Sequence, residues 1–69
     1  MPEIVLKYTK HAAEMKLERG VSDSEIRKAI RQGARVKQRD GMLAVYGDIM
    51  VAYVKESKNV YRIKTIMIR

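Results

Sequence analysis

Cationic and phenolic side chains in the second half of the chain have the clearest capacity for chemistry. Residues 35–69 carry eight Lys/Arg against three Asp/Glu, whereas residues 1–34 carry seven against five. The positive surplus therefore rises from two to five between the halves. Such a surplus attracts anionic partners, typically the phosphate backbone of a nucleic acid. An ordinary solvated surface is the alternative interpretation.

Residues on or beside the predicted strands are candidates for nucleic-acid binding: Arg35, Lys37, Arg39, Tyr46, Tyr61, Arg62 and Lys64. Cations hold phosphates, and phenol rings stack on bases. A cation can also stabilise the charge that develops at phosphorus during RNA cleavage, and Arg62 is the candidate for that catalytic role. Cross-strand aromatic packing is the alternative interpretation of the tyrosines.

His11 is the only histidine of the chain and a candidate for proton transfer. On a helix, Met15 and Arg19 follow it at i+4 and i+8, which places a cation on the same side as the imidazole. His11 and Arg19 are therefore candidate catalytic residues. The alternative is that His11 packs at the helix start and bonds a backbone carbonyl.

Neither a metal nor a cofactor is expected from the sequence. The chain has no cysteine and one histidine, so a zinc site would need carboxylates as its other ligands. No phosphate-binding loop, dinucleotide fingerprint or nucleophile elbow occurs in it.

The first elements that position these residues are a strand and a helix. Polar and apolar residues alternate over residues 3–8, which predicts a strand with one buried face. Thr9 can then cap a helix that runs to about Arg19, and Gly20 can end it. The apolar stripe of this helix is weak, with Ala12 three residues before Met15 and Ala13 four before Leu17.

The second helix has the clearest local signals. Ser22 and Glu25 have the spacing of a capping box, flanked by the apolar pair Val21 and Ile26. The predicted buried face consists of Ile26, Ala29 and Ile30. Gly33 is expected to end the helix in the left-handed conformation.

After Ala34 the period changes to two, which predicts strands joined by tight turns. Arg35, Lys37 and Arg39 share one side of the first of these strands. We expect turns at Asp40-Gly41, Gly47-Asp48 and residues 57–59. The last strand should run over residues 60–68, with Tyr61, Ile63, Thr65 and Met67 on one face.

The sequence therefore predicts one α+β domain over residues 1–69, in the order β-α-α-β-β-β-β. Its two short helices should pack on one face of an antiparallel sheet. The longest apolar runs are far shorter than the roughly 20 residues of a membrane span, and residues 1–3 lack the features of a secretory signal. Together with the absence of cysteine, this makes the cytoplasm the expected location.

Two short motifs resemble a known family. His11-Ala12 and the run Glu18-Arg19-Gly20-Val21-Ser22 resemble the signature of the family catalogued as domain of unknown function 4258, in which His-Ala precedes Arg-Gly-Ile-Ser and a helix. With the strand-rich end at residues 63–66, the resemblance covers nearly the whole chain. It makes His11 and Arg19 signature positions without assigning them a role.

The element order of that family is similar to the RelE and ParE toxins of bacterial and archaeal toxin-antitoxin modules. Resemblance to RelE implies a metal-independent ribonuclease that cuts mRNA at the ribosome through a 2′-hydroxyl and is silenced by an antitoxin. ParE-like relatives act on gyrase, so element order alone does not choose the target. The leading hypothesis is a RelE-like toxin-type domain that binds RNA. The enzyme hypothesis adds that this domain cleaves the bound RNA without a metal ion. The alternatives are a non-catalytic module that binds nucleic acid or an acidic protein, and an inactive toxin homologue.

Overall fold

The predicted order of elements is confirmed by the computed structural model, which describes residues 4–68. The chain begins with β1 (Val5–Tyr8), α1 (Lys10–Arg19) and α2 (Asp23–Gln32). Four further strands follow: β2 (Ala34–Gln38), β3 (Gly41–Tyr46), β4 (Ile49–Ser57) and β5 (Val60–Ile68). Residue 3 of the predicted first strand lies outside the described residues.

The five strands form one mixed sheet in the order β1-β5-β4-β3-β2. Strands β2 to β5 pair as an antiparallel meander, as predicted, but β1 pairs parallel with β5. The prediction of an antiparallel sheet is therefore wrong for β1. Two helices separate β1 from the meander, so no hairpin turn fixes its direction.

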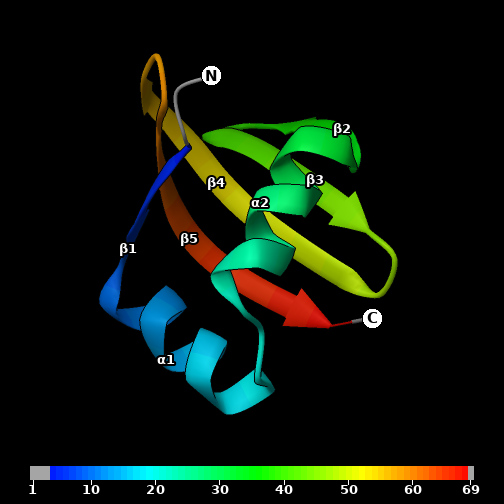
Figure 1. Cartoon of the computed structure of the whole chain (residues 1–69). Helices are drawn as coiled ribbons and strands as arrows, with labels where there is room; N and C mark the ends of the chain where they lie inside the picture. The colour runs from blue at the N-terminus through cyan, green and yellow to red at the C-terminus, as the bar shows by residue number, and fades with distance from the viewer. Residues whose placement is uncertain (1–3, 69) are drawn as a thin grey trace.

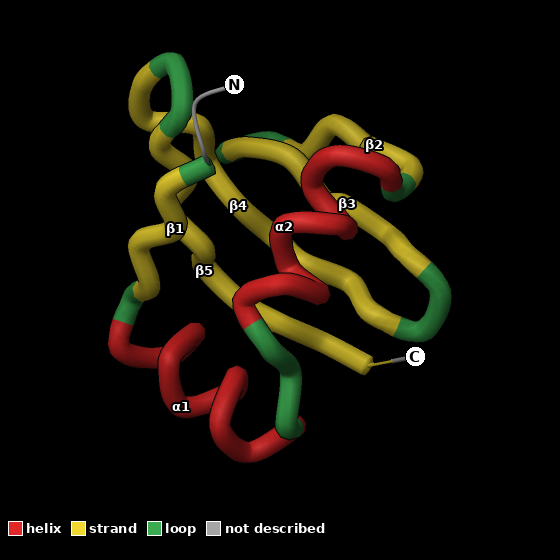
Figure 2. Tube along the Cα trace, in the orientation of Figure 1, coloured by secondary structure: helices red, strands yellow, loops and turns green. Residues whose placement is uncertain are grey.

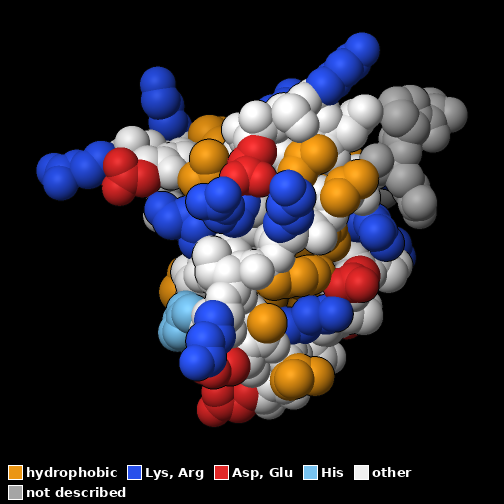
Figure 3. Space-filling view, turned by 90° about the vertical axis from the view of Figure 1, so that its left-hand side faces the viewer, with side chains coloured by type: hydrophobic (Ala, Val, Ile, Leu, Met, Phe, Trp, Pro, Cys, Tyr) orange, Lys and Arg blue, Asp and Glu red, His pale blue; other side chains and the backbone are white. Residues whose placement is uncertain are grey.

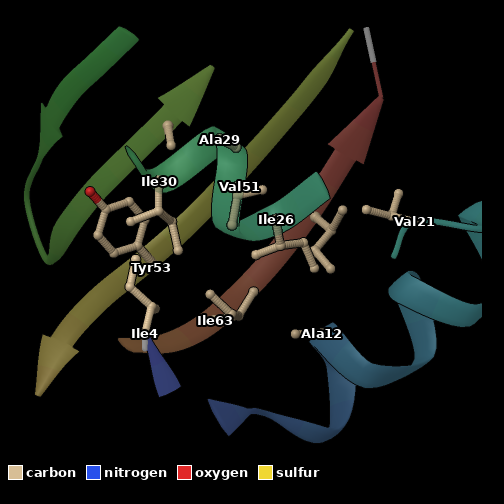
Figure 4. Close-up of a cluster of buried hydrophobic side chains, with 11 residues drawn as sticks. Ile4, Ala12, Val21, Ile26, Ala29, Ile30, Val51, Tyr53 and Ile63 are labelled. Carbon is tan, nitrogen blue, oxygen red and sulfur yellow. The ribbon is translucent and has the colours of Figure 1, made fainter. Parts of the chain in front are cut away.

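Both helices lie on the same side of the sheet (Figures 1 and 2), and the core lies between the helices and the sheet. Helix α1 packs mainly on β5, whereas α2 packs on β3 and β4. Figure 4 shows Ile26 and Ala29 of α2 facing Val51 and Ile63 of the sheet, and all four side chains are fully buried. Burial of such aliphatic side chains supplies the main stabilisation of a domain this small.

The first helix contributes little to the core, as its weak stripe suggested. Ala12 is fully buried and Met15 packs against the core, but Leu17 is 84% exposed. The sequence placed Leu17 on the apolar stripe, and this part of the prediction is wrong. Leu17 follows Ala12 by five residues, which turns it about 140° away from the buried side of the helix.

Three of the four predicted helix ends are confirmed. Thr9 Oγ1 accepts a hydrogen bond from the Ala12 N–H at 3.1 Å, and Gly20 is left-handed with φ 65°. The capping box between Ser22 and Glu25 is complete. Gly33 is instead extended, with φ −74°, and a Cβ there would lie 2.5 Å from the Ala29 carbonyl oxygen. Glycine is needed at this position for close backbone approach rather than for a left-handed turn.

The first hairpin turn lies one residue earlier than predicted. Gln38 pairs with Gly41, so Arg39 and Asp40 form the turn and Gly41 begins β3. A Cβ on Gly41 would collide with the carbonyl oxygen of Tyr53 on β4, which explains why glycine stands there. The other two predicted turns are present, at Gly47-Asp48 and Lys58-Asn59.

Strand β5 contains a bulge that the sequence pattern did not reveal. Ala52 pairs with Thr65 and Tyr53 pairs with Ile63, so Lys64 has no partner on β4. Ile63 and Ile66 are both fully buried although they are three residues apart. The predicted alternation is therefore wrong beyond Ile63, because the extra residue reverses the two faces.

Candidate nucleic-acid interface

The most cationic segment of the chain runs from the first turn of α2 through β2 into the turn that follows it. Residues 26–39 contain six Lys/Arg and no Asp/Glu. We call these six residues the α2–β2 surface: Arg27, Lys28, Arg31, Arg35, Lys37 and Arg39. The sequence predicted Arg35, Lys37 and Arg39 as binding residues but not the three cations of α2.

Helix and strand form one continuous surface because only Gly33 separates them. The Gly33 N–H still donates to the Ala29 carbonyl oxygen at 2.9 Å, and Arg35 Nη2 donates to the Ile30 carbonyl oxygen at 3.1 Å. Arg35 therefore satisfies a carbonyl in the last turn of α2, where a cation also complements the helix dipole. These bonds fix the start of β2 against the end of α2.

The strand register directs two of the cations toward the helix side of the sheet. Arg35 pairs with Ala44, which belongs to the buried core, and Lys37 pairs with Met42, which packs against that core. Directly paired residues project to the same face of a sheet. Arg35 and Lys37 therefore lie on the face that carries α2. Strand β2 is also an edge of the sheet, and all five of its residues are exposed.

No carboxylate pairs with the α2–β2 surface within the described residues. The three ion pairs among the described residues are Lys7–Glu56, Lys16–Asp23 and Arg62–Glu56, and none of them includes a residue of this surface. Arg27 is half-buried, and its Nε donates to the Ile4 carbonyl oxygen at 3.3 Å rather than to a carboxylate. The positive potential of this surface is therefore available to an external anion.

Two other predicted cations lie elsewhere and have different surroundings. Arg62 pairs with Lys7 of β1 and Val54 of β4, on the face of the sheet opposite the helices. Glu56 Oε2 forms an ion pair with Arg62 Nη2, and Glu56 Oε1 lies 3.9 Å from Lys7 Nζ. One carboxylate is therefore shared by both cations. We call these three residues the Glu56 cluster. Lys64 is the exposed bulge residue of β5.

Figure 3 views the molecule from the side where β1 faces the viewer, and Lys and Arg side chains are interspersed there with acidic ones. This mixture of signs differs from the uniform sign of residues 26–39.

The predicted tyrosines divide into one packed and one exposed residue. The Tyr61 ring lies edge-on to Tyr53, with the centroids 5.4 Å apart, and Lys55 Nζ lies 5.9 Å from its centroid. Tyr61 is therefore engaged in packing. Tyr46 at the end of β3 is 38% exposed.

The three candidate catalytic residues do not converge. His11 is exposed in the first turn of α1, two residues after Thr9, whose N–H donates to the Ile63 carbonyl oxygen of β5 at 3.2 Å. Arg19 ends the same helix, about 12 Å further along its axis. Arg62 is directed to the other face of the sheet, where it bonds Glu56.

A cavity of about 360 Å³ lies where the α1–α2 junction meets the β3–β4 turn. Its lining comes from both regions: Arg19, Gly20, Val21, Glu25, Tyr46, Gly47, Asp48, Ile49 and Ile68. It brings together Arg19 and Tyr46, which the sequence assigned to separate roles. Sequence reasoning missed this cavity because its two sides are more than 20 residues apart in the chain.

A polar cluster that the sequence did not reveal joins β1 to both helices. The Tyr8 hydroxyl donates to Asp23 Oδ1, and Lys16 Nζ lies 2.7 Å from the same oxygen and 5.1 Å from the Tyr8 ring centroid. Hydrogen bonds from Lys16 and Tyr8 lower the pKa of Asp23, while burial and the Asp23 contact raise the pKa of Tyr8. The cluster is a structural bridge in which the carboxylate stays ionised.

No family model, curated protein or solved structure matches the chain. Among residues 4–68 no helix has the length and apolar character needed to cross a membrane. In the same range no group of three or more His, Asp or Glu side chains is arranged to hold a metal ion. The candidate interface therefore rests on geometry and charge alone.

Proposed function

We propose that this chain is an RNA-binding domain of the RelE-like toxin type, which holds the RNA backbone on the α2–β2 surface. The observation that supports this function is the run of six cations without a carboxylate partner among the described residues. Cations of this kind bind nucleic acids by releasing the counterions condensed on the phosphates. The resemblance in the sequence favours RNA over other polyanions.

The direct test is the binding of a fluorescently labelled single-stranded RNA of 12 nucleotides, followed by anisotropy between about 50 and 200 mM salt. The logarithm of the binding constant should fall linearly with the logarithm of the salt concentration, by about 0.7 per phosphate contacted. DNA of the same sequence and an acidic peptide serve as competitors. An absence of binding at 50 mM salt, or a complex insensitive to salt, would refute the proposal.

The geometry supports RNA binding more directly than RNA cleavage, because His11, Arg19 and Arg62 lie apart and Arg62 is bonded to Glu56. A RelE-like ribonuclease would cut RNA through the 2′-hydroxyl and remain active in chelator. Incubation with RNA, with and without translating ribosomes, separates the two functions. Cleavage that a 2′-deoxy substitution abolishes would establish the enzyme, and Arg62→Ala and His11→Ala would then test the two side chains. Intact RNA in both assays would exclude the ribonuclease and support a non-catalytic RNA-binding domain.

A further inference from the structure

The floor of the cavity beside Arg19 is an apolar row at one end of the sheet. Tyr46 of β3 pairs with Ile49 of β4, and Ile49 pairs with Ile68 of β5. Val21 is buried beside this row, but Tyr46 and Ile68 remain 38% and 43% exposed. A row of large apolar side chains is therefore accessible inside a concave site, as ligand-binding sites typically require.

Three charged side chains surround the apolar floor. Arg19 and Asp48 form no ion pair within the described residues. Glu25 Oε1 accepts the Ser22 N–H at 3.1 Å, so this carboxylate is fixed at the start of α2. Two carboxylates and one guanidinium repel a bare phosphate on balance, because like charges are disfavoured at short range. They suit a ligand whose edge carries both donors and acceptors.

We propose that this cavity binds one unstacked base of the RNA, with the base stacked on the Tyr46 ring. A nucleobase has two flat apolar faces and an edge of mixed donors and acceptors, which matches the apolar row and the mixed charges. Arg19 donates to base acceptors, and Asp48 accepts from amino groups of the base. This inference rests on the proposed function and names a second subsite for the same ligand.

The location of the cavity fits a strand that also contacts the α2–β2 surface. Helix α2 starts at the cavity, where Glu25 contributes to the lining, and ends at β2. Its ten residues span about 15 Å. Exposed Lys28 and Arg31 lie between the two ends. A strand of a few nucleotides can therefore lie along α2 with its phosphates on the cations and one base in the cavity.

The test compares an RNA oligonucleotide with a fully abasic one of the same length, because both carry the same phosphates. The wild-type chain should bind the intact RNA roughly fivefold to a hundredfold more tightly than the abasic chain. Tyr46→Ala should reduce this ratio to about one, whereas Tyr46→Phe should keep it. The salt dependence should stay the same in all three proteins, since no phosphate contact is lost.

Thermal unfolding of each variant confirms that the fold is retained. An unchanged ratio of intact to abasic affinity in folded Tyr46→Ala would overturn the base site. Failure of the proposed function has a different signature, which is the loss of binding to both oligonucleotides at low salt.

Discussion

The α2–β2 surface and the Glu56 cluster contain the same kinds of side chain but differ in their carboxylates. In the Glu56 cluster, Lys7 and Arg62 share one acidic partner across β1, β4 and β5. On the α2–β2 surface six cations have no such partner within the described residues. A count of Lys and Arg does not distinguish the two regions, but only the α2–β2 surface leaves its positive charge available to a ligand.

The uniform sign of the α2–β2 surface also protects the edge of the sheet. Strand β2 exposes unpaired backbone groups, and Val36 on it is 50% exposed. Cations on an edge strand discourage another strand from pairing with it. The same side chains can therefore keep the edge unpaired and bind an anion.

The largest expected effect comes from the residue that joins the two halves of the surface. In Gly33→Ala the new Cβ would lie 2.5 Å from the Ala29 carbonyl oxygen and 2.6 Å from that of Val45. We expect a loss of about 1–3 kcal/mol in the free energy of unfolding, measured in urea. Gly20→Asn is the control, because a Cβ at Gly20 would meet no other atom within 4 Å and asparagine tolerates the left-handed region. Equal stability of Gly33→Ala and the wild type would show that this close approach is absent.

The second prediction converts the α2–β2 surface into a region of mixed charge. Gln32→Glu with Gln38→Glu places one carboxylate next to Arg31 and one between Lys37 and Arg39 in the chain, without removing any cation. RNA affinity at low salt should fall roughly tenfold or more, and the salt slope should decrease by about 1.4. Ser57→Glu with Asn59→Asp is the control with the same net charge at a distant turn. Equal losses in both double variants would mean that net charge alone governs binding.

The third prediction makes the opposite change in the Glu56 cluster. Glu56→Gln leaves Lys7 and Arg62 without their carboxylate partner, so the face of the sheet opposite the helices should also attract RNA, and RNA affinity at low salt should rise a few-fold. Unfolding free energy should change by less than about 1 kcal/mol, because both cations are largely exposed. Glu14→Gln on α1 removes the same charge from a residue outside these ion pairs. If both variants bind alike, the pairing with Glu56 does not restrain the cations.

The smallest effect concerns Asp23, another carboxylate engaged by a cation. Its pKa is lowered from the ordinary 3.8 by the hydrogen bonds from Lys16 and Tyr8. The resulting stabilisation is present above about pH 4 and is lost as the pH falls through the lowered pKa. Asp23→Asn should remove this part of the acid-induced decrease, by less than about 1 kcal/mol since the side chain is half exposed. Urea unfolding between pH 2 and 6 measures it, and identical pH profiles of variant and wild type would contradict the role of Asp23.

Local signals in the sequence were sufficient for most of the fold. The capping box at Ser22 and the change of period at Ala34 depend on neighbouring residues, and both predictions are confirmed. The parallel pairing of β1 and the bulge at Lys64 depend on contacts between distant strands. Gly33 and Gly41 were misread because glycine signals a turn locally, whereas here it permits close approach of another backbone segment.

The candidate site was harder to predict than the fold. Arg35, Lys37 and Arg39 were recognised from their alternation, but Arg62 could not be separated from them without knowing that Glu56 lies beside it. Sequence spacing placed Arg19 near His11, whereas the fold places it beside Tyr46 in a cavity. Ion pairs and cavities between distant segments set these differences, and a single sequence does not record them.

The most direct test of the α2–β2 surface compares the salt dependence of RNA binding in two quadruple variants of equal net charge. The first replaces Lys28, Arg31, Lys37 and Arg39 with glutamine and keeps Arg27 and Arg35, which bond main-chain carbonyls. The second makes the same change at four cations outside the surface: Lys10, Lys55, Lys58 and Lys64. We predict that the first variant loses up to about 2.8 of the slope of log K against log salt, while the second stays near the wild type. Equal slopes in the two variants would contradict a role for the α2–β2 surface in binding.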